Sequence, residues 1–314
     1  MSQTLRIATY QTELQARGPA LLLRDIKRET DEVMARVALI KQANPDVLIL
    51  QGIDWDYDAR ALTALNAHLG FDHMFTSLPN AGMATGLDMD GDGQLGQPRD
   101  AQGYGRFAGH GGVAVLSKRP IVGPVIDLSD LLWRDLPDAD LPTYPDGAPF
   151  PSARAQAAQR LSSQVHWIVP FDGFTLATFA ATPPIFDGDE DRNGKRNADE
   201  IRLWAHLLDG RLDAALAERG APNGGASMSQ SFILAGLFNL DPSKGSLMGQ
   251  MFARADLQDA APTAHTAEFR NAYRLRLSYV LASPDITPRS SGVLWPPDGM
   301  GRHGLVWADV TLRP

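Results

Sequence analysis

Cysteine is absent from this chain of 314 residues, which excludes disulfides, thiolate nucleophiles and thiolate metal ligands. No apolar run approaches the ~18 residues that a membrane-spanning helix needs, so we expect no membrane partner. A basic segment followed by a long apolar stretch is also missing from Met1 to Tyr10, and no signal peptide is predicted there. The localisation stays open: cytoplasmic if Met1 is the native start, periplasmic or secreted if a signal peptide was removed.

Positive charge is in deficit, and the net charge is -8 at pH 7. Nucleic-acid surfaces need clustered Lys and Arg to displace counterions, so nucleic acid is not the expected partner. An apolar content of 44% and a charged content of 21% are ordinary for a soluble globular protein. With this length, they predict one domain over residues 1–314 with a well-buried core.

The hydrophobic pattern predicts many short strands and few helices. Strands are expected at Leu5–Tyr10, Val47–Leu50, Val113–Ser117, Gln164–Pro170, Phe174–Ala180, Phe232–Ala235, Ser278–Leu281 and Leu305–Leu312. Helices are expected at Thr30–Asn44, Ala59–Leu69 and Asn197–Arg219. Two irregular regions, 77–110 and 127–160, are long enough to suggest a functional role. Strands spread through the whole chain favour stacked sheets with helices outside.

Six sequence segments occur in a fixed order along the chain. They are LRIATYQTEL at the start, PDVLILQGID at 45–54, GGVAVLSKRPI at 111–121, TFAATPPIFDG at 178–188, ILAGLFNLDP at 233–242, and SYVLASP with RHGLVWADV near the end. Together they resemble a bacterial branch of the endonuclease/exonuclease/phosphatase superfamily over nearly the full length. The resemblance implies an α/β (α+β) fold, a four-layered sandwich of two facing mixed β-sheets flanked by helices, with a site at one end of the sheets.

The resemblance also implies phosphoester cleavage with a divalent metal, but the residues for it are mostly replaced. The replacements are Gly52 for a metal-binding Glu, Ala180 for a His, and Leu237 and Arg302 for two Asp residues. Asn239 and His303 are the vestiges of the polar set, so no catalytic residue is assigned. Gly, Ala and Leu cannot ligate a hard cation, and we expect no catalytic Mg²⁺.

These replacements predict a non-catalytic family member that binds an unidentified ligand or partner protein. One alternative is a phosphoester hydrolase that uses relocated or metal-independent chemistry around His303 and Arg302. Another is a structural subunit of a complex, in which the two irregular regions form an interface.

Arg302 reverses the charge at its position, and a guanidinium offers a planar fork of donors. An anion site is therefore predicted from Gln11, Asn239, Arg302 and His303. The alternative is that Arg302 faces solvent or pairs with a nearby acid such as Asp54.

A calcium-loop pattern, D-x-[DN]-x-[DN]-G-x₅-E, begins at residue 189. Its ligands are Asp189, Asp191, Asn193, Lys195 (through its backbone), Asn197 and Glu200. A weaker second loop contains Asp88, Asp90, Asp92 and Gln94 but has Arg99 at position 12, so that Asp100 or a remote acid is needed to close the shell. Structural calcium is the cofactor predicted, against solvated acidic turns as the alternative.

Overall fold

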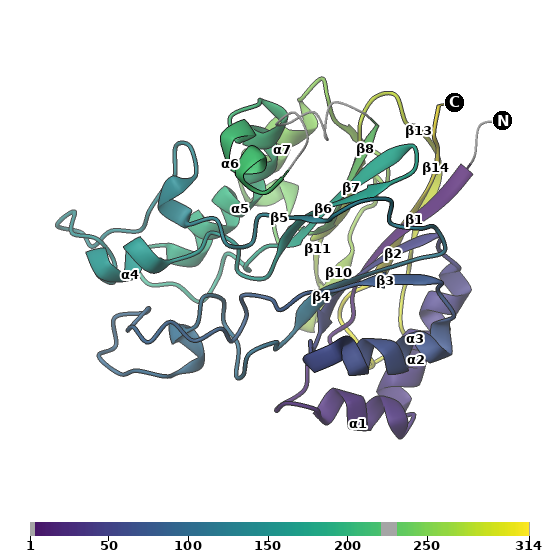
Figure 1. Cartoon of the computed structure of the whole chain (residues 1–314), viewed down its shortest axis with the longest axis horizontal. Helices are drawn as coiled ribbons and strands as arrows, with labels where there is room; N and C mark the ends of the chain where they lie inside the picture. The colour runs from purple at the N-terminus through teal and green to yellow at the C-terminus, as the bar shows by residue number, and fades with distance from the viewer. Residues whose placement is uncertain (1–3, 221–230, 314) are drawn as a thin grey trace.

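Two six-stranded mixed sheets face each other in the computed structural model, which describes residues 4–220 and 231–313 (Figure 1). The first sheet has the order β13-β14-β1-β2-β4-β3 and the second β5-β6-β7-β8-β12-β9. The strands of the first are β1 (Thr4–Gln11), β2 (Val47–Ile53), β3 (His73–Phe75), β4 (Gly112–Ser117), β13 (Thr287–Leu294) and β14 (Leu305–Thr311). Those of the second are β5 (Ile126–Asp127), β6 (His166–Phe171), β7 (Phe174–Ala180), β8 (Phe232–Leu237), β9 (Gln258–Asp259) and β12 (Ser278–Ala282).

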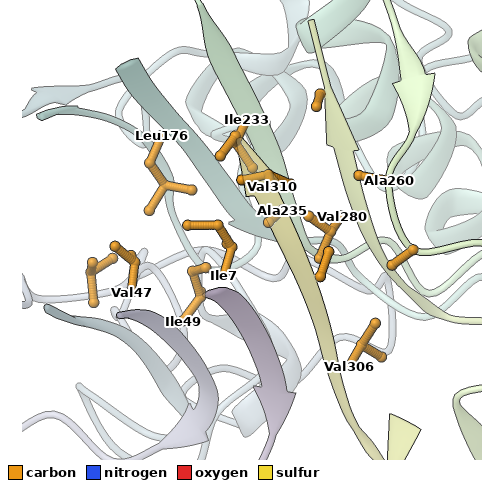
Figure 2. Packing of buried hydrophobic residues seen from close by; sticks show 14 of the residues in the cluster. Ile7, Val47, Ile49, Leu176, Ile233, Ala235, Ala260, Val280, Val306 and Val310 are labelled. Atoms are coloured by element: carbon orange, nitrogen blue, oxygen red, sulfur yellow. The ribbon is translucent and has the colours of Figure 1, made fainter. Parts of the chain in front are cut away.

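The main core fills the space between the sheets (Figure 2). Alternate residues of each strand point inward, so Ile7 and Ile49 of the first sheet meet Ile233 and Val280 of the second. A short hairpin, β10 (Ala267–Phe269) with β11 (Tyr273–Leu275), lies outside both sheets.

Helices cover the two outer faces. The first sheet packs on α1 (Leu21–Lys27), α2 (Asp31–Ala43) and α3 (Arg60–Leu69). The second packs on α5 (Arg192–Leu208), α6 (Asp213–Glu218) and α7 (Leu247–Phe252), while α4 (Ala153–Ala158) lies in the second irregular region. The predicted four-layered α/β sandwich is confirmed. No helix within the described residues is long and apolar enough to cross a membrane.

The predicted strands all form, within a few residues of the expected ends. Residues 77–110 and 127–160 are mainly irregular, as predicted, and project from one end of the sheets in Figure 1. The long helix predicted at Asn197–Arg219 is wrong in extent, because α5 starts earlier, at Arg192, and the chain turns at Gly210, where φ is +73°, before α6. Strand β13 was not predicted, because this edge strand is mostly exposed or half-buried and its sequence lacks alternating apolar residues.

The α5 helix turns an unusual set of charged side chains into the protein. Both oxygens of the Glu200 carboxylate accept backbone N–H groups, from Ser163 and from Thr182, each at 2.6 Å. Burial raises the pKa of Glu200, while Arg196 and these donors oppose the rise by favouring the charged form. Two backbone N–H donors on one buried carboxyl group fix its position firmly.

The same face of α5 holds the irregular regions in place. Arg196 donates to the carbonyl oxygens of Gln102 and Leu161, at 2.7 and 2.8 Å. One turn further on, Asp199 accepts from the Trp133 indole at 2.7 Å and from the Asp140 N–H at 2.8 Å. Backbone groups in loops that lack sheet partners are thereby satisfied by side chains of one helix.

The calcium loop predicted from Asp189 to Glu200 is therefore wrong. Its positions from Asn193 onward lie inside α5, where successive side chains diverge around the helix instead of converging on an ion. The Glu200 carboxylate, which was expected to close the calcium shell, is fully buried and accepts backbone N–H groups with both oxygens. The side-chain amide of Asn197 donates to the carbonyls of Thr182 and Phe238.

Glu200→Gln should lower the free energy of unfolding by about 2–4 kcal/mol, because an amide NH₂ would face a backbone N–H and Arg196 would lose its buried counter-charge. Urea denaturation followed by circular dichroism measures this. Glu218→Gln, which removes an exposed carboxylate at the end of α6, is the matched control and should change little. Equal effects of the two changes would contradict this account of α5.

Candidate functional site

The sheet-end site is the place where β1, β2, β7, β8 and β12 end or begin side by side. It comprises Gln11, Gly52, Ala180, Leu237, Ser278, Asn239 and His303. A β-bridge between Ala267 and His303 joins the β10–β11 hairpin to the chain entering β14. The Gly304 N–H also donates to the Thr266 carbonyl at 2.9 Å, and the Thr266 hydroxyl accepts from the Ser278 N–H at 3.0 Å. The ends of both sheets therefore meet at this site.

Gly52 lies at a β-bulge in β2 and has a left-handed φ of +66°. Glycine is favoured in such a bulge because it has no Cβ to clash. A Cβ at this position would lie 2.4 Å from Oε1 of Gln11 and 2.9 Å from Oε1 of Gln15. The side chain of Gln11 therefore occupies the space into which a longer residue at position 52 would extend.

Three neighbouring strands of the second sheet carry Ala180, Leu237 and Ser278 across this end. Leu237 stands directly opposite Ala180 on β7 and opposite Ser278 on β12. Ala180 and Leu237 are 3% and 4% exposed and belong to the core between the sheets. Apolar packing thus continues to the end of the sandwich, where the resemblance implied a His and an Asp.

Asn239 follows β8 in a left-handed conformation, with φ of +55°. Its side-chain amide donates to the carbonyl of Ala181 at 2.7 Å and ties the loop after β7 to the loop after β8. The Asn239 side chain thus has a structural role, because it fixes the backbone of the loop after β7.

Arg302 is paired with an acid that the sequence analysis did not consider. Its Nε and Nη2 atoms lie 2.6 and 2.5 Å from Oε1 of Glu13, and its backbone N–H donates to Oε2 at 2.6 Å. Burial acts to raise the pKa of Glu13, but these donors outweigh it and hold the pKa below its usual value. Of the alternatives considered, pairing with an acid is the one observed, although the acid is not Asp54.

Asp54 instead ties two loops together. Its carboxylate accepts the N–H groups of Ala16 and Gly111, both at 2.8 Å. Burial raises the pKa of Asp54 to about 6 against the pull of these two donors.

His303 is buried, at 7% exposure, and its ring packs edge-on against Phe269 with centroids 5.9 Å apart. Burial lowers the pKa of His303, so the imidazole is neutral at neutral pH. Its Nδ1 atom and Oε1 of Gln11 have no hydrogen-bond partner within residues 4–220 and 231–313. The anion site predicted from Gln11, Asn239, Arg302 and His303 stays a prediction: Arg302 pairs with Glu13, and the Asn239 amide donates to Ala181.

The second predicted calcium loop does bring carboxylates together. Asp88, Asp90 and Asp100 form an acidic cluster in which one oxygen from each lies within 4.8 Å of the others. Asp92 and Gln94 lie outside this cluster, and the Asp92 carboxylate accepts from the Gln94 N–H at 2.8 Å. The cluster is in the first irregular region, away from the sheet-end site.

Two facing mixed sheets, covered by outer helices and with a site at one end, make this protein an α/β sandwich. The chain belongs to the endonuclease/exonuclease/phosphatase family, whose model matches residues 37–308. No curated protein matches the chain in a sequence comparison.

Solved structures of this family have the same fold. The endonuclease/exonuclease/phosphatase from Beutenbergia cavernae DSM 12333 has a TM-score of 0.59 at 18% identity, over 99% of this chain and 72% of that one. The human Nocturnin catalytic domain with bound sulfate anion scores 0.56 at 13% identity, over 100% and 97%. Sphingomyelinase C from Streptomyces griseocarneus scores 0.53 at 17% identity, over 98% and 99%. At these identities the likeness shows the fold alone.

The metal that members of this family typically use does not fit the residues present. A hard divalent cation needs several oxygen ligands, chiefly carboxylates. Around position 52 the structure offers the amide of Gln11 and the buried side chain of Leu237, while the Glu13 carboxylate is committed to Arg302. Glu13 was missed because its partner lies 289 residues away in sequence.

Gly52→Ala should destabilise the fold more than Gly70→Ala. Both positions have a left-handed φ, but a Cβ at Gly70 meets nothing within 4 Å, whereas at Gly52 it meets Gln11 at 2.4 Å. The left-handed strain costs each variant about 1 kcal/mol, and displacement of the buried end of Gln11 should cost Gly52→Ala a further amount of up to ~1 kcal/mol. Chemical denaturation gives both values.

Adding Gln11→Ala to Gly52→Ala should recover part of the loss, since the clashing amide is removed. If Gly52→Ala and Gly70→Ala lose the same stability, Gln11 does not fill the position as described.

Proposed function

We propose that this protein is a non-catalytic member of the endonuclease/exonuclease/phosphatase family that acts by binding a ligand or a partner protein. The observation that carries the proposal is the geometry at Gly52, where a left-handed bulge holds a glycine and the end of the Gln11 side chain takes the adjoining space. Leu237 and Ala180, packed in the core between the sheets, supply neither a metal ligand nor a proton carrier at their positions on the opposite sheet.

A binding role is supported by the irregular regions that project beside the sheet-end site (Figure 1). They carry large apolar side chains in contact with solvent, including Leu95 at 67% and Tyr104 at 58% exposure. Long loops held on a rigid scaffold frequently carry binding residues. With a net charge of -8, a protein partner is favoured over nucleic acid.

The alternative is a phosphoester hydrolase built on His303 and Arg302. It needs Arg302 to leave Glu13 and the buried His303 to reach a substrate. The arrangement of both residues therefore favours the binding role.

Purified protein should not turn over a generic phosphodiester or phosphomonoester above the buffer rate, with either Mg²⁺ or Mn²⁺ present. A family member that keeps the Glu, His and Asp residues serves as the positive control. Loss of a single general acid or base commonly costs a factor of ~10² to 10⁴, so the combined losses should leave no measurable rate. Turnover that disappears in His303→Ala would refute the proposal and support the hydrolase.

We also propose that the acidic cluster of Asp88, Asp90 and Asp100 binds calcium as a structural ion. Burial and the nearby carboxylates of Asp92 and Asp100 raise the pKa of Asp90, so a cation would relieve their repulsion. Asp88 is already oriented by the N–H groups of Gly91 and Gly93, at 2.6 and 2.9 Å. Two arginines are the competing counter-charges: Arg99, whose Nη1 atom lies 3.9 Å from Oδ2 of Asp90, and Arg192, which carries positive charge near the cluster.

Excess Ca²⁺ should raise the Tm of the protein by a few degrees relative to EDTA, because an ion that binds only the folded state stabilises it. Asp100→Asn should abolish the increase, and Asp92→Asn should retain it, since Asp92 lies outside the cluster. Differential scanning fluorimetry is sufficient. An identical Tm with Ca²⁺ and with EDTA in the unchanged protein would show that calcium is not a structural ion here.

A further inference from the structure

Glu13 is held in a strained backbone conformation beside the sheet-end site. Its φ of +55° lies in the left-handed region, which is uncommon for a residue other than glycine. The loop around it is fixed at both ends: the Thr12 N–H donates to the Gln51 carbonyl at 2.9 Å, and the Ala16 N–H donates to Asp54 at 2.8 Å. Such strain persists where the surroundings enforce it, and it is frequent at functional sites.

The conformation directs the Glu13 carboxylate onto Arg302. Both of its oxygens are used, Oε2 by the Arg302 N–H and Oε1 by the guanidinium. The side chain of Glu13 is 11% exposed, whereas that of Arg302 is 60% exposed and lies over the Phe269 ring, 5.7 Å from its centroid. The donors that hold the carboxylate are therefore reachable from solvent on the arginine side.

A second cation lies behind the pair. Arg36 is 4% exposed, and its Nε atom donates to the Thr12 carbonyl at 3.0 Å. A Cβ on Gly301 would lie 3.2 Å from Nη2 of Arg36 and 3.4 Å from Oε2 of Glu13. Because glycine has no side chain, both groups can lie close to the backbone at position 301. Arg302 pairs directly with the Glu13 carboxylate, and Arg36, which donates to the backbone of the same loop, adds a buried positive charge nearby.

We propose that the Glu13 carboxylate is an internal oxyanion that masks an oxyanion-binding site formed by the backbone N–H and guanidinium of Arg302, with Arg36 behind them. An external phosphate-like anion binds there by displacing Glu13. This inference rests on the proposed non-catalytic role, because the site offers hydrogen-bond donors for an anion in place of metal ligands. Displacement of Glu13 would also release the strained backbone and move the loop at residues 12–16.

The test compares binding of inorganic phosphate to the unchanged protein and to Glu13→Gln, by isothermal titration calorimetry at pH 7 and fixed ionic strength. Gln keeps the length of the side chain but does not neutralise Arg302. A tethered carboxylate competes at an effective concentration of millimolar or more, so Glu13→Gln should bind phosphate at least about tenfold more tightly. Adding Arg302→Gln should abolish the gain.

Glu268→Gln is the matched control. Glu268 pairs with Arg274 at 3.1 Å on the neighbouring hairpin, so its loss changes the net charge equally without exposing Arg302. It should bind phosphate no better than the unchanged protein. If Glu13→Gln does not fold, Glu13→Ala is measured in its place.

Equal phosphate binding by the unchanged protein and the Glu13 variant, or binding by neither, would overturn the masked site. That outcome leaves the non-catalytic proposal standing, because the latter is decided by turnover. Conversely, turnover by the unchanged protein with Mg²⁺ refutes the non-catalytic role whatever the phosphate titration gives.

Discussion

The space between the two sheets must be filled or hydrogen-bonded up to its end, and this constraint determines the character of the site. At the position where the family resemblance implied a metal ligand, the bulge at Gly52 is filled by Gln11. On the facing sheet, Leu237 extends the apolar core. A buried carboxylate left there without a cation or a donor would destabilise the fold strongly. Replacement of the charged residues is thus consistent with a sandwich that is stable without metal.

A similar rule explains the irregular regions. Loops without sheet partners must satisfy their backbone groups elsewhere. Arg196 donates to the backbone of both regions, at Gln102 and Arg160, and Glu200 accepts from the loop after β7, at Thr182. The acidic and basic residues of this segment therefore stabilise a projecting surface, and the shape of that surface depends on one helix.

The sequence predicted the fold well because strand signals are local and because the six family segments occur in order along the chain. It failed at residues 189–200, where acidic residues with the spacing of a calcium loop instead lead into and form a helix, and local spacing does not distinguish the two. The positions of Gly52, Leu237 and His303 at one site were predicted through the resemblance. The pairing of Glu13 with Arg302 was not, because it depends on two loops that only the folded sandwich brings together.

We expect that the position at which the family binds its catalytic metal binds no metal in this protein. Crystals soaked in Mn²⁺ and measured at the manganese absorption edge test it directly, because anomalous scattering locates the ion without reference to activity. No anomalous peak is expected among Gln11, Leu237, Asn239 and His303. A peak at that place with carboxylate ligands would contradict it.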